Sequence, residues 1–203
     1  MNTQRSFLVL LILTISAIYG QAQLHGTLDF RYGLGLSENV IDKNMSVENY
    51  QPSNISVAVS GLYEFTPQIW AGVGLNTSIN NSAVLQYNGI TYSTTPIMQF
   101  APYLTMRYRP IKQHLNAYLF TDLGYSIPFE KSVNFSKGWL WNAGIGYSYM
   151  FRKHFGLNFN IGYNLLQIVG TPIVVTDKNT GNESKIISNN LRHSVTFAIG
   201  LVF

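Results

Sequence analysis

Alternation of apolar and polar residues is the feature that most constrains this chain. From Leu24 to the carboxyl end, apolar residues recur at every second position in eight separate stretches. A period of two puts successive side chains on opposite faces of a strand, whereas a helix needs a period near 3.6. The predicted strands cover residues 24–36, 54–65, 68–79, 97–109, 115–125, 139–149, 155–165 and 191–203. The chain is therefore predicted to be all-β with eight strands, each about the ~9–11 residues that a tilted strand needs to cross a bilayer.

The connections between these strands alternate in length. Short turns are expected at 66–67, 110–113 and 151–153, and long polar loops at 37–53, 80–96, 128–136 and 167–190. Outer-membrane barrels alternate short periplasmic turns with longer outer loops in this way. An even number of strands also brings both termini to one side, here the periplasmic side. The pattern predicts an antiparallel up-and-down transmembrane β-barrel.

Six charged residues of the predicted strands fall on the face that is rich in Gly, Ser and Asn. They are Asp29, Arg31, Glu64, Arg107, Asp122 and Arg192. A soluble eight-stranded barrel such as a lipocalin would instead place large apolar residues inside and ions outside. A Lys or Arg that faces lipid at the midplane costs ~2–4 kcal/mol, which is enough to exclude it from that face. We therefore predict that the apolar face meets lipid and that the six ions form a cluster inside the barrel.

The interior of such a barrel is predicted to be filled. Eight strands enclose only enough space for side chains. Glycines on the inner face are expected to make room for Trp70, Tyr103, Tyr118 and Phe120. Arg and carboxylate groups should neutralise one another, because unpaired buried ions are costly. A proton path or binding site is the alternative reading of these ions.

Composition narrows the class of protein further. The 203 residues fit one domain, 11% are charged and 14% are aromatic, which suits a chain that meets lipid. The net charge of +4 is too small and too scattered to indicate nucleic-acid binding. The absence of cysteine excludes disulfides, thiolate metal sites and a lipid-modified cysteine.

The first 22 residues are typical of a signal peptide. Arg5 precedes an apolar run over 7–18, and Gly20 and Ala22 supply small residues for cleavage after Ala22. The run is short for a membrane span, although an uncleaved N-terminal helix is the alternative. We predict a signal peptide at 1–22 and an outer-membrane barrel domain at 23–203.

Several of these features together resemble a known family. The signal peptide, the eight alternating strands, the long loops and the terminal Phe203 look like small OmpA/OmpX-type outer-membrane barrels. Gly-aromatic strands such as Gly144-Ile145-Gly146-Tyr147 are similar to the outer membrane protein beta-barrel domain family of Bacteroidetes. The resemblance implies that the barrel-assembly machinery recognises the last strand through Phe197, Ile199, Leu201 and Phe203. Members of this family have adhesive, structural and uncharacterised roles, so the resemblance does not imply one activity.

Catalytic, cofactor-binding and metal-binding residues are not predicted. Lipid A deacylases and palmitoyltransferases occur on this fold, and His193 beside Ser194 is the candidate for a catalytic pair. Adjacent strand residues point to opposite faces, and therefore these two side chains cannot cooperate directly. His, Asp and Glu lack metal-ligand spacing, and no phosphate-binding loop lies between a strand and a helix. The chain is predicted to be non-enzymatic; the alternatives are a lipid-modifying outer-membrane enzyme or a helper subunit of a secretion or uptake complex.

Two long loops contain hairpin signals. Residues 83–87 and 90–93 flank Asn88-Gly89, and residues 173–176 and 184–187 flank a second polar turn. Their exposed edges could pair with a strand of another protein or a host surface, or could merely stiffen the loops. We expect a monomer of the bacterial outer membrane that contacts membrane lipids and lipopolysaccharide. Its expected role is envelope-structural or surface-binding, through loops 80–96 and 167–190.

Overall fold

The computed structural model describes residues 24–40, 46–47, 53–80, 84–87, 90–93, 97–110, 116–129, 135–152, 155–170, 173–176, 183–186 and 189–203. The predicted signal peptide at 1–22 lies outside these residues. In the described part of the chain, no helix is long and apolar enough to cross a membrane.

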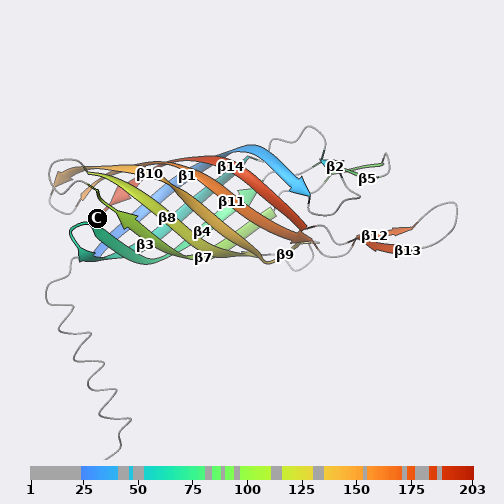
Figure 1. The fold of residues 1–203 in the computed structure, drawn as a ribbon, viewed down its shortest axis with the longest axis horizontal. Helices are drawn as coiled ribbons and strands as arrows, with labels where there is room; N and C mark the ends of the chain where they lie inside the picture. The colour runs from blue at the N-terminus through green and yellow to red at the C-terminus, as the bar shows by residue number, and fades with distance from the viewer. Residues whose placement is uncertain are drawn as a thin grey trace, which may run out of the picture.

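Eight long strands form one closed antiparallel barrel (Figure 1). They are β1 (Leu24–Val40), β3 (Asn54–Thr66), β4 (Ile69–Asn80), β7 (Ile97–Tyr108), β8 (Ala117–Pro128), β10 (Gly138–Arg152), β11 (Phe155–Gly170) and β14 (Asn189–Val202). Each strand pairs with the next in the chain, and β1 pairs with β14 to close the ring. The prediction of an eight-stranded up-and-down β-barrel is confirmed.

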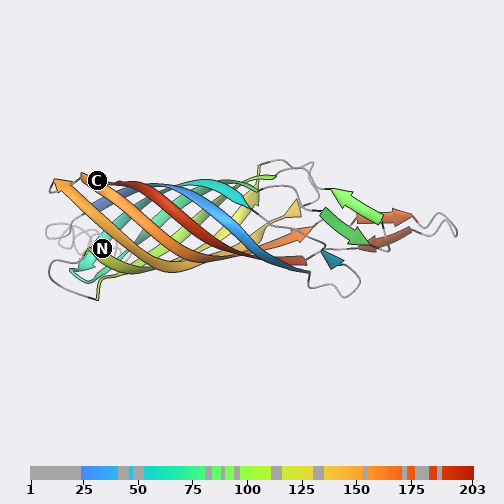
Figure 2. The ribbon, with the colours of Figure 1, turned by 90° about the horizontal axis from the view of Figure 1, so that it is seen from above.

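Six short strands lie in the connections. They are β2 (Ser46–Val47), β5 (Val84–Tyr87), β6 (Ile90–Ser93), β9 (Phe135–Ser136), β12 (Ile173–Thr176) and β13 (Glu183–Ile186). The β5–β6 and β12–β13 hairpins extend beyond one end of the barrel, whereas the carboxyl end of the chain lies at the other (Figures 1 and 2). We call these the hairpin end and the terminal end.

The chain ends close the barrel at the terminal end. Gly26 and Phe203 exchange two backbone hydrogen bonds, with N···O distances of 2.6 and 2.9 Å. Two of the tight turns also lie at this end, and in the β3–β4 turn the Thr66 hydroxyl accepts a hydrogen bond from the backbone N–H of Ile69 at 3.0 Å. Among the described residues, the ends of β1 and β14 and the β3–β4 turn therefore have hydrogen-bonded backbone at this end.

The barrel wall is apolar outside and polar inside. Leu104 and Met106 are 64% and 44% exposed, whereas Thr105 between them is 4% exposed. The same alternation runs along all eight strands, and among the described residues buried polar side chains outnumber buried apolar ones by about two to one. A soluble domain buries its large apolar residues, so this barrel has the opposite polarity.

Aromatic side chains fill the interior above inward-facing glycines. Tyr103 lies against Gly74, and Tyr118 lies against Gly146, so closely that a β-carbon at either glycine would overlap the tyrosine ring. Trp70, Tyr103, Tyr118 and Phe120 are all buried. Eight strands leave no wider space than these side chains need.

Candidate functional site

A network of four ions occupies the middle of the barrel interior. Arg31 donates a hydrogen bond to Asp122 at 3.1 Å and lies 3.7 Å from Asp29. Arg107 approaches Asp29 from β7, with 4.0 Å between the guanidinium nitrogen and the carboxylate oxygen. Asp29 is completely buried and Asp122 is 2% exposed. Two arginines and two aspartates balance in charge, which offsets part of the cost of removing them from water.

Neutral side chains complete this central network. Asn158 donates to Asp29 at 2.8 Å, and Asn142 donates to Asp122 at 3.3 Å. The Tyr118 hydroxyl donates to Asn158 at 2.5 Å, while the Arg107 guanidinium lies 4.8 Å from the centre of the Tyr118 ring. These residues come from β1, β7, β8, β10 and β11, so the network cross-links opposite walls.

The other two predicted interior ions lie outside the central network. Glu64, near the terminal end of β3, lies 3.3 Å from the Nε2 atom of His25. Arg192 is buried near the hairpin end of β14, where its backbone pairs with Glu38 of β1. The six residues that the sequence grouped together therefore form a central group of four and one residue towards each end.

A stack of three side chains occupies the interior at the terminal end. The His25 ring lies parallel to Trp70 with 4.1 Å between centroids, and the Arg109 guanidinium lies 3.7 Å from the Trp70 ring centre. Both groups are too close to the indole to share one of its faces, so they lie on opposite faces. Burial lowers the pKa of Arg109, and the Glu64 carboxylate acts in the opposite direction. This stack narrows the barrel interior between the central network and the terminal end.

The outer wall carries aromatic residues near both rims. Tyr149 packs edge-on against Phe151 at the terminal end, with 5.2 Å between ring centroids. Towards the hairpin end, Tyr125 packs edge-on against Trp139 at 5.3 Å, and the Trp141 indole donates to Thr121 at 3.0 Å. Aromatic side chains near both ends of the outer wall are typical of proteins whose surface crosses two lipid–water interfaces.

The His193–Ser194 pair does not form a catalytic arrangement in this structure. His193 hydrogen bonds through Nδ1 to the Tyr163 hydroxyl on the outer surface, at 2.5 Å. Ser194 points inward and is 3% exposed. Within the described ranges, no group of three or more His, Asp or Glu side chains has a geometry that could hold a metal ion.

The predicted assembly residues of the last strand share the outer face. Phe197, Ile199 and Phe203 are exposed and Leu201 is partly exposed, whereas the intervening Gly200 and Val202 are buried and Ala198 is partly exposed. The Phe203 ring lies over Gly26, whose missing side chain makes this close approach possible. The last strand thus presents an apolar row next to the seam between β1 and β14.

The long loops contain small sheets of their own. Strand β5 pairs with β6 from Val84↔Ser93 to Tyr87↔Ile90, and β2 of the first loop adds to β5. In the last loop, β12 pairs with β13 from Ile173↔Ile186 to Thr176↔Glu183. Among the described residues β2 and β6 are the outer strands of the first sheet. The Asn88-Gly89 turn that predicted the first hairpin lies outside the described residues.

Comparisons with known proteins find solved structures that are similar to this chain, but they do not assign it to a family. No protein-family model matches the chain, and no curated protein matches it in sequence. Neisserial surface protein A is 9% identical with a TM-score of 0.46, covering 88% of this chain and 97% of its own. A Pseudomonas aeruginosa FadL homologue is 10% identical with a TM-score of 0.35, over 75% of this chain and 37% of that one. The Escherichia coli outer membrane protease OmpT is 8% identical with a TM-score of 0.34, over 90% and 95%.

At identities of 8–10% and TM-scores below 0.5, these likenesses do not carry location or activity from those proteins to this chain. Its function has to be argued from its own residues.

Sequence reasoning missed the uncharged members of the interior network. The alternation alone indicates no partner for Asn142, Asn158 or His25. Their roles depend on which strands meet across the barrel, as in the Asn158–Asp29 contact between residues 129 positions apart. The alternation placed each side chain inside, but only the register between strands determines its partner.

Proposed function

We propose that this chain is a non-enzymatic outer-membrane β-barrel that anchors surface-exposed hairpins, with an envelope-structural or partner-binding role. The observation that supports this most strongly is the reversed polarity of the wall. Large side chains such as Val73 and Leu104 are more than 60% exposed on the outside, while complete ion pairs lie inside. Such a surface is costly in water and favourable against acyl chains.

Membrane insertion is tested by refolding the chain into lipid vesicles. A folded barrel should migrate faster than the boiled sample in a denaturing gel and should resist protease only when lipid or detergent is present. A chain that is folded and monomeric in buffer without detergent would contradict the proposal.

The plugged interior supports an anchoring role rather than a pore. The ion network and the Trp70 stack cross the interior at two levels, and the charges within each level are balanced or covered by aromatic rings. A water-filled channel needs a wider barrel or an open interior. We therefore assign the function to the ends and surface of the barrel.

Partner binding through the hairpins is the more specific part of the proposal. An outer strand of a small sheet carries backbone N–H and C=O groups on one side that can pair with another chain. The sheet formed by β2, β5 and β6 and the β12–β13 hairpin both lie beyond the hairpin end of the barrel (Figure 2). Both are therefore suited to adding a strand from a protein partner or a host-surface protein.

Deletion of residues 83–93 and 171–187 tests this role. The shortened barrel should still assemble in the outer membrane, since none of the eight barrel strands is cut, but cells should lose binding to the host surface or partner. The matched control replaces the same residues with Gly-Ser linkers of equal length, which keeps loop length and removes strand pairing. Unchanged binding in both variants would refute the partner-binding role and leave only the envelope-structural one.

A further inference from the structure

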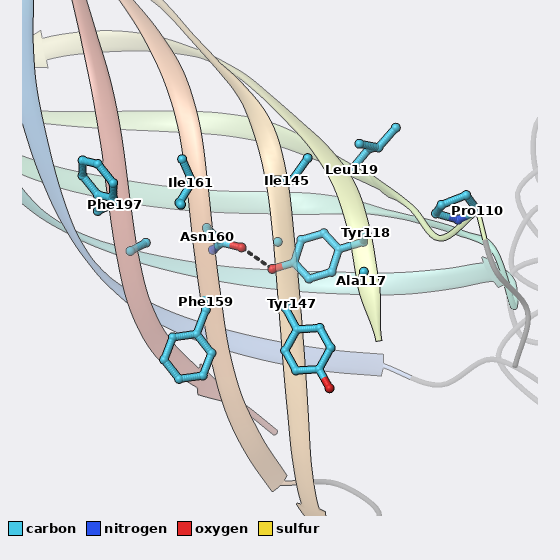
Figure 3. A pocket seen from close by; sticks show the side chains of 12 residues that line it. Pro110, Ala117, Tyr118, Leu119, Ile145, Tyr147, Phe159, Asn160, Ile161 and Phe197 are labelled. Atoms are coloured by element: carbon cyan, nitrogen blue, oxygen red, sulfur yellow. Dashed lines mark hydrogen bonds between the residues drawn. The ribbon is translucent and has the colours of Figure 1, made fainter. Parts of the chain in front are cut away.

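We propose that the outer wall holds one acyl chain of a periplasmic-leaflet phospholipid in a preformed groove. This inference rests on the proposed membrane location and on the orientation predicted from the sequence, in which both chain termini are periplasmic. The groove has a volume of about 540 Å³ and lies across β8, β10, β11 and β14 (Figure 3).

The strand register builds the two banks of the groove. One bank is the row Leu119, Ile145, Ile161 and Phe197, whose members are register partners from strand to strand. The other bank is the row Ala117, Tyr147 and Phe159. In Figure 3, Ile145 and Ile161 point to one side, and Tyr147 and Phe159 point to the other. Neighbouring rows that lean apart leave a furrow between them.

The floor of the groove is formed by residues that fill no space outside the wall. Gly146 has no side chain, and Ala198 has only a methyl group. Tyr118 and Asn160 direct their side chains inward, where the tyrosine hydroxyl hydrogen bonds to the asparagine (Figure 3). The backbone of this row is therefore open to the outside, and a ligand can approach it closely.

A second groove continues the first in the same direction. It has a volume of about 450 Å³, shares Phe197 and Ala198 with the first, and runs on past Tyr32 to Ile55. The combined path begins beside Pro110 in the β7–β8 connection at the terminal end. It ends at the second residue of β3, at the opposite end of that strand. A long, narrow and diagonal path fits an extended chain better than a compact ligand.

The chemistry of the groove favours an acyl chain. Its side walls are aliphatic and aromatic, and the proposed function places it where lipid chains are the solvent. The hydrophobic effect gives no free energy when an apolar group moves from lipid to an apolar protein surface. Selective binding of an acyl chain therefore has to come from close packing. An acyl chain that lies in the groove contacts protein on three sides, whereas an acyl chain on a convex wall contacts protein on one side only. The groove therefore gives the acyl chain more dispersion contacts.

The position of the near end favours a phospholipid of the periplasmic leaflet. Pro110 and Ala117 place this end at the rim that also carries the chain terminus. Arg152 is exposed at the same end of β10 and adds positive charge there. Anionic and zwitterionic phospholipid head groups are attracted to basic residues at such a rim.

Photolabelling of refolded barrel tests the groove. The barrel is inserted into phosphatidylethanolamine–phosphatidylglycerol vesicles that contain phosphatidylethanolamine with a diazirine in its acyl chain, and adducts are mapped by mass spectrometry. We expect adducts concentrated on β10 and β11. Ala117→Phe fills the near end of the groove and should lower labelling there about fivefold, the factor that losing several close carbon–carbon contacts would produce. Ile145→Trp fills it from the other bank and should act in the same direction.

Ala71→Phe is the matched control. Ala71 lies near the terminal end of β4, is partly exposed like Ala117, and does not line either groove. This variant should leave the labelling of β10 and β11 unchanged. Gel mobility without boiling verifies that each variant is folded.

Three results would overturn the inference. Even labelling around the wall, or labelling that neither groove-filling variant reduces, would reject the groove and leave the membrane location intact. Displacement of the label by lipopolysaccharide rather than by unlabelled phospholipid would reject the periplasmic-leaflet ligand. A protein that acquires no adducts on any strand and stays protease-sensitive would reject the proposed function and this inference together.

Discussion

At the scale of single residues, the central ion network is the arrangement with the largest energetic consequences. Arg31 lies between Asp29 and Asp122, and Arg107 adds a second cation beside Asp29. A buried charge that loses its partner costs far more than an exposed one, because neither water nor another ion replaces the lost contact. Such a network contributes to uniqueness of packing only when every member is present.

Replacing both partners of the Arg31–Asp122 pair should therefore destabilise the barrel by less than the two single replacements added together. We expect Asp122→Asn and Arg31→Met each to cost about 3 kcal/mol of unfolding free energy, in the range observed for broken buried pairs. The double variant should cost less than the sum of the two. Urea unfolding in lipid vesicles measures all three, and strictly additive losses would show that the pair is not coupled.

Gly74, which faces the barrel interior, should not tolerate a larger side chain. The Tyr103 ring and the Val59 backbone occupy the space that a side chain would need. Gly74→Val should lower the yield of folded barrel severalfold, because the Val59 carbonyl oxygen would lie 2.7 Å from the new β-carbon and belongs to the paired backbone, which cannot rotate away. Gly61→Val is the control, since nothing lies within 4 Å of a β-carbon there. Equal yields for both variants, measured by gel mobility, would contradict this packing.

The contacts between side chains inside the barrel were predicted least well from the sequence. Alternation identified the inner and outer side of nearly every strand residue, including Asp29 and Asp122. It could not reveal that His25 stacks on Trp70 or that Arg109 covers the other face of the same ring. Those contacts join β1, β4 and the β7–β8 connection, and they depend on a register that is set by the whole closed sheet.

At the scale of strands, the strand lengths and connections were predictable from the sequence. The points at which some strands end towards the hairpin end were not. Predicted and observed bounds agree within a few residues for most strands, since alternation and turn residues mark both. The exceptions are β1 and β11, which run to 17 and 16 residues. In β1 the alternation ends at Leu36, and in β11 it ends at the adjacent pair Leu165 and Leu166, whereas the backbone pairing with β14 continues to Val40 and Val169. Backbone hydrogen bonds to β14 extend both β1 and β11 beyond the part of each strand in which apolar and polar residues alternate.

The seam between the first and last strands leads to a prediction about assembly. Phe203 exchanges backbone hydrogen bonds with Gly26, and its ring covers that glycine on the outer wall. Phe203→Ala should reduce the amount of barrel assembled in cells severalfold, both by weakening the seam and by removing the predicted assembly signal. Phe65→Ala is the control, because Phe65 is also an exposed aromatic near the terminal end. Comparable losses in both variants would show that any rim aromatic serves equally.

At the scale of the whole molecule, a plugged barrel should not conduct ions. The central network and the Trp70 stack occupy the interior at two levels. In planar bilayers we expect no stable conductance above background, since an eight-stranded interior is filled by side chains. Insertion is verified in parallel by protease protection. Steady, single-valued channel openings from inserted protein would contradict the plugged interior.

Reversed polarity of the wall is the claim on which the membrane location, the anchoring role and the lipid groove all depend. It can be tested residue by residue, because the chain contains no cysteine that would have to be removed first. Single cysteines at Leu104, Thr105 and Met106 are spin-labelled in vesicle-inserted protein, and their accessibility to oxygen and to a water-soluble nickel complex is measured. Oxygen should relax the labels at 104 and 106 strongly, and the label at 105 should be shielded from both reagents. Strong nickel access at 104 and 106 would contradict the account.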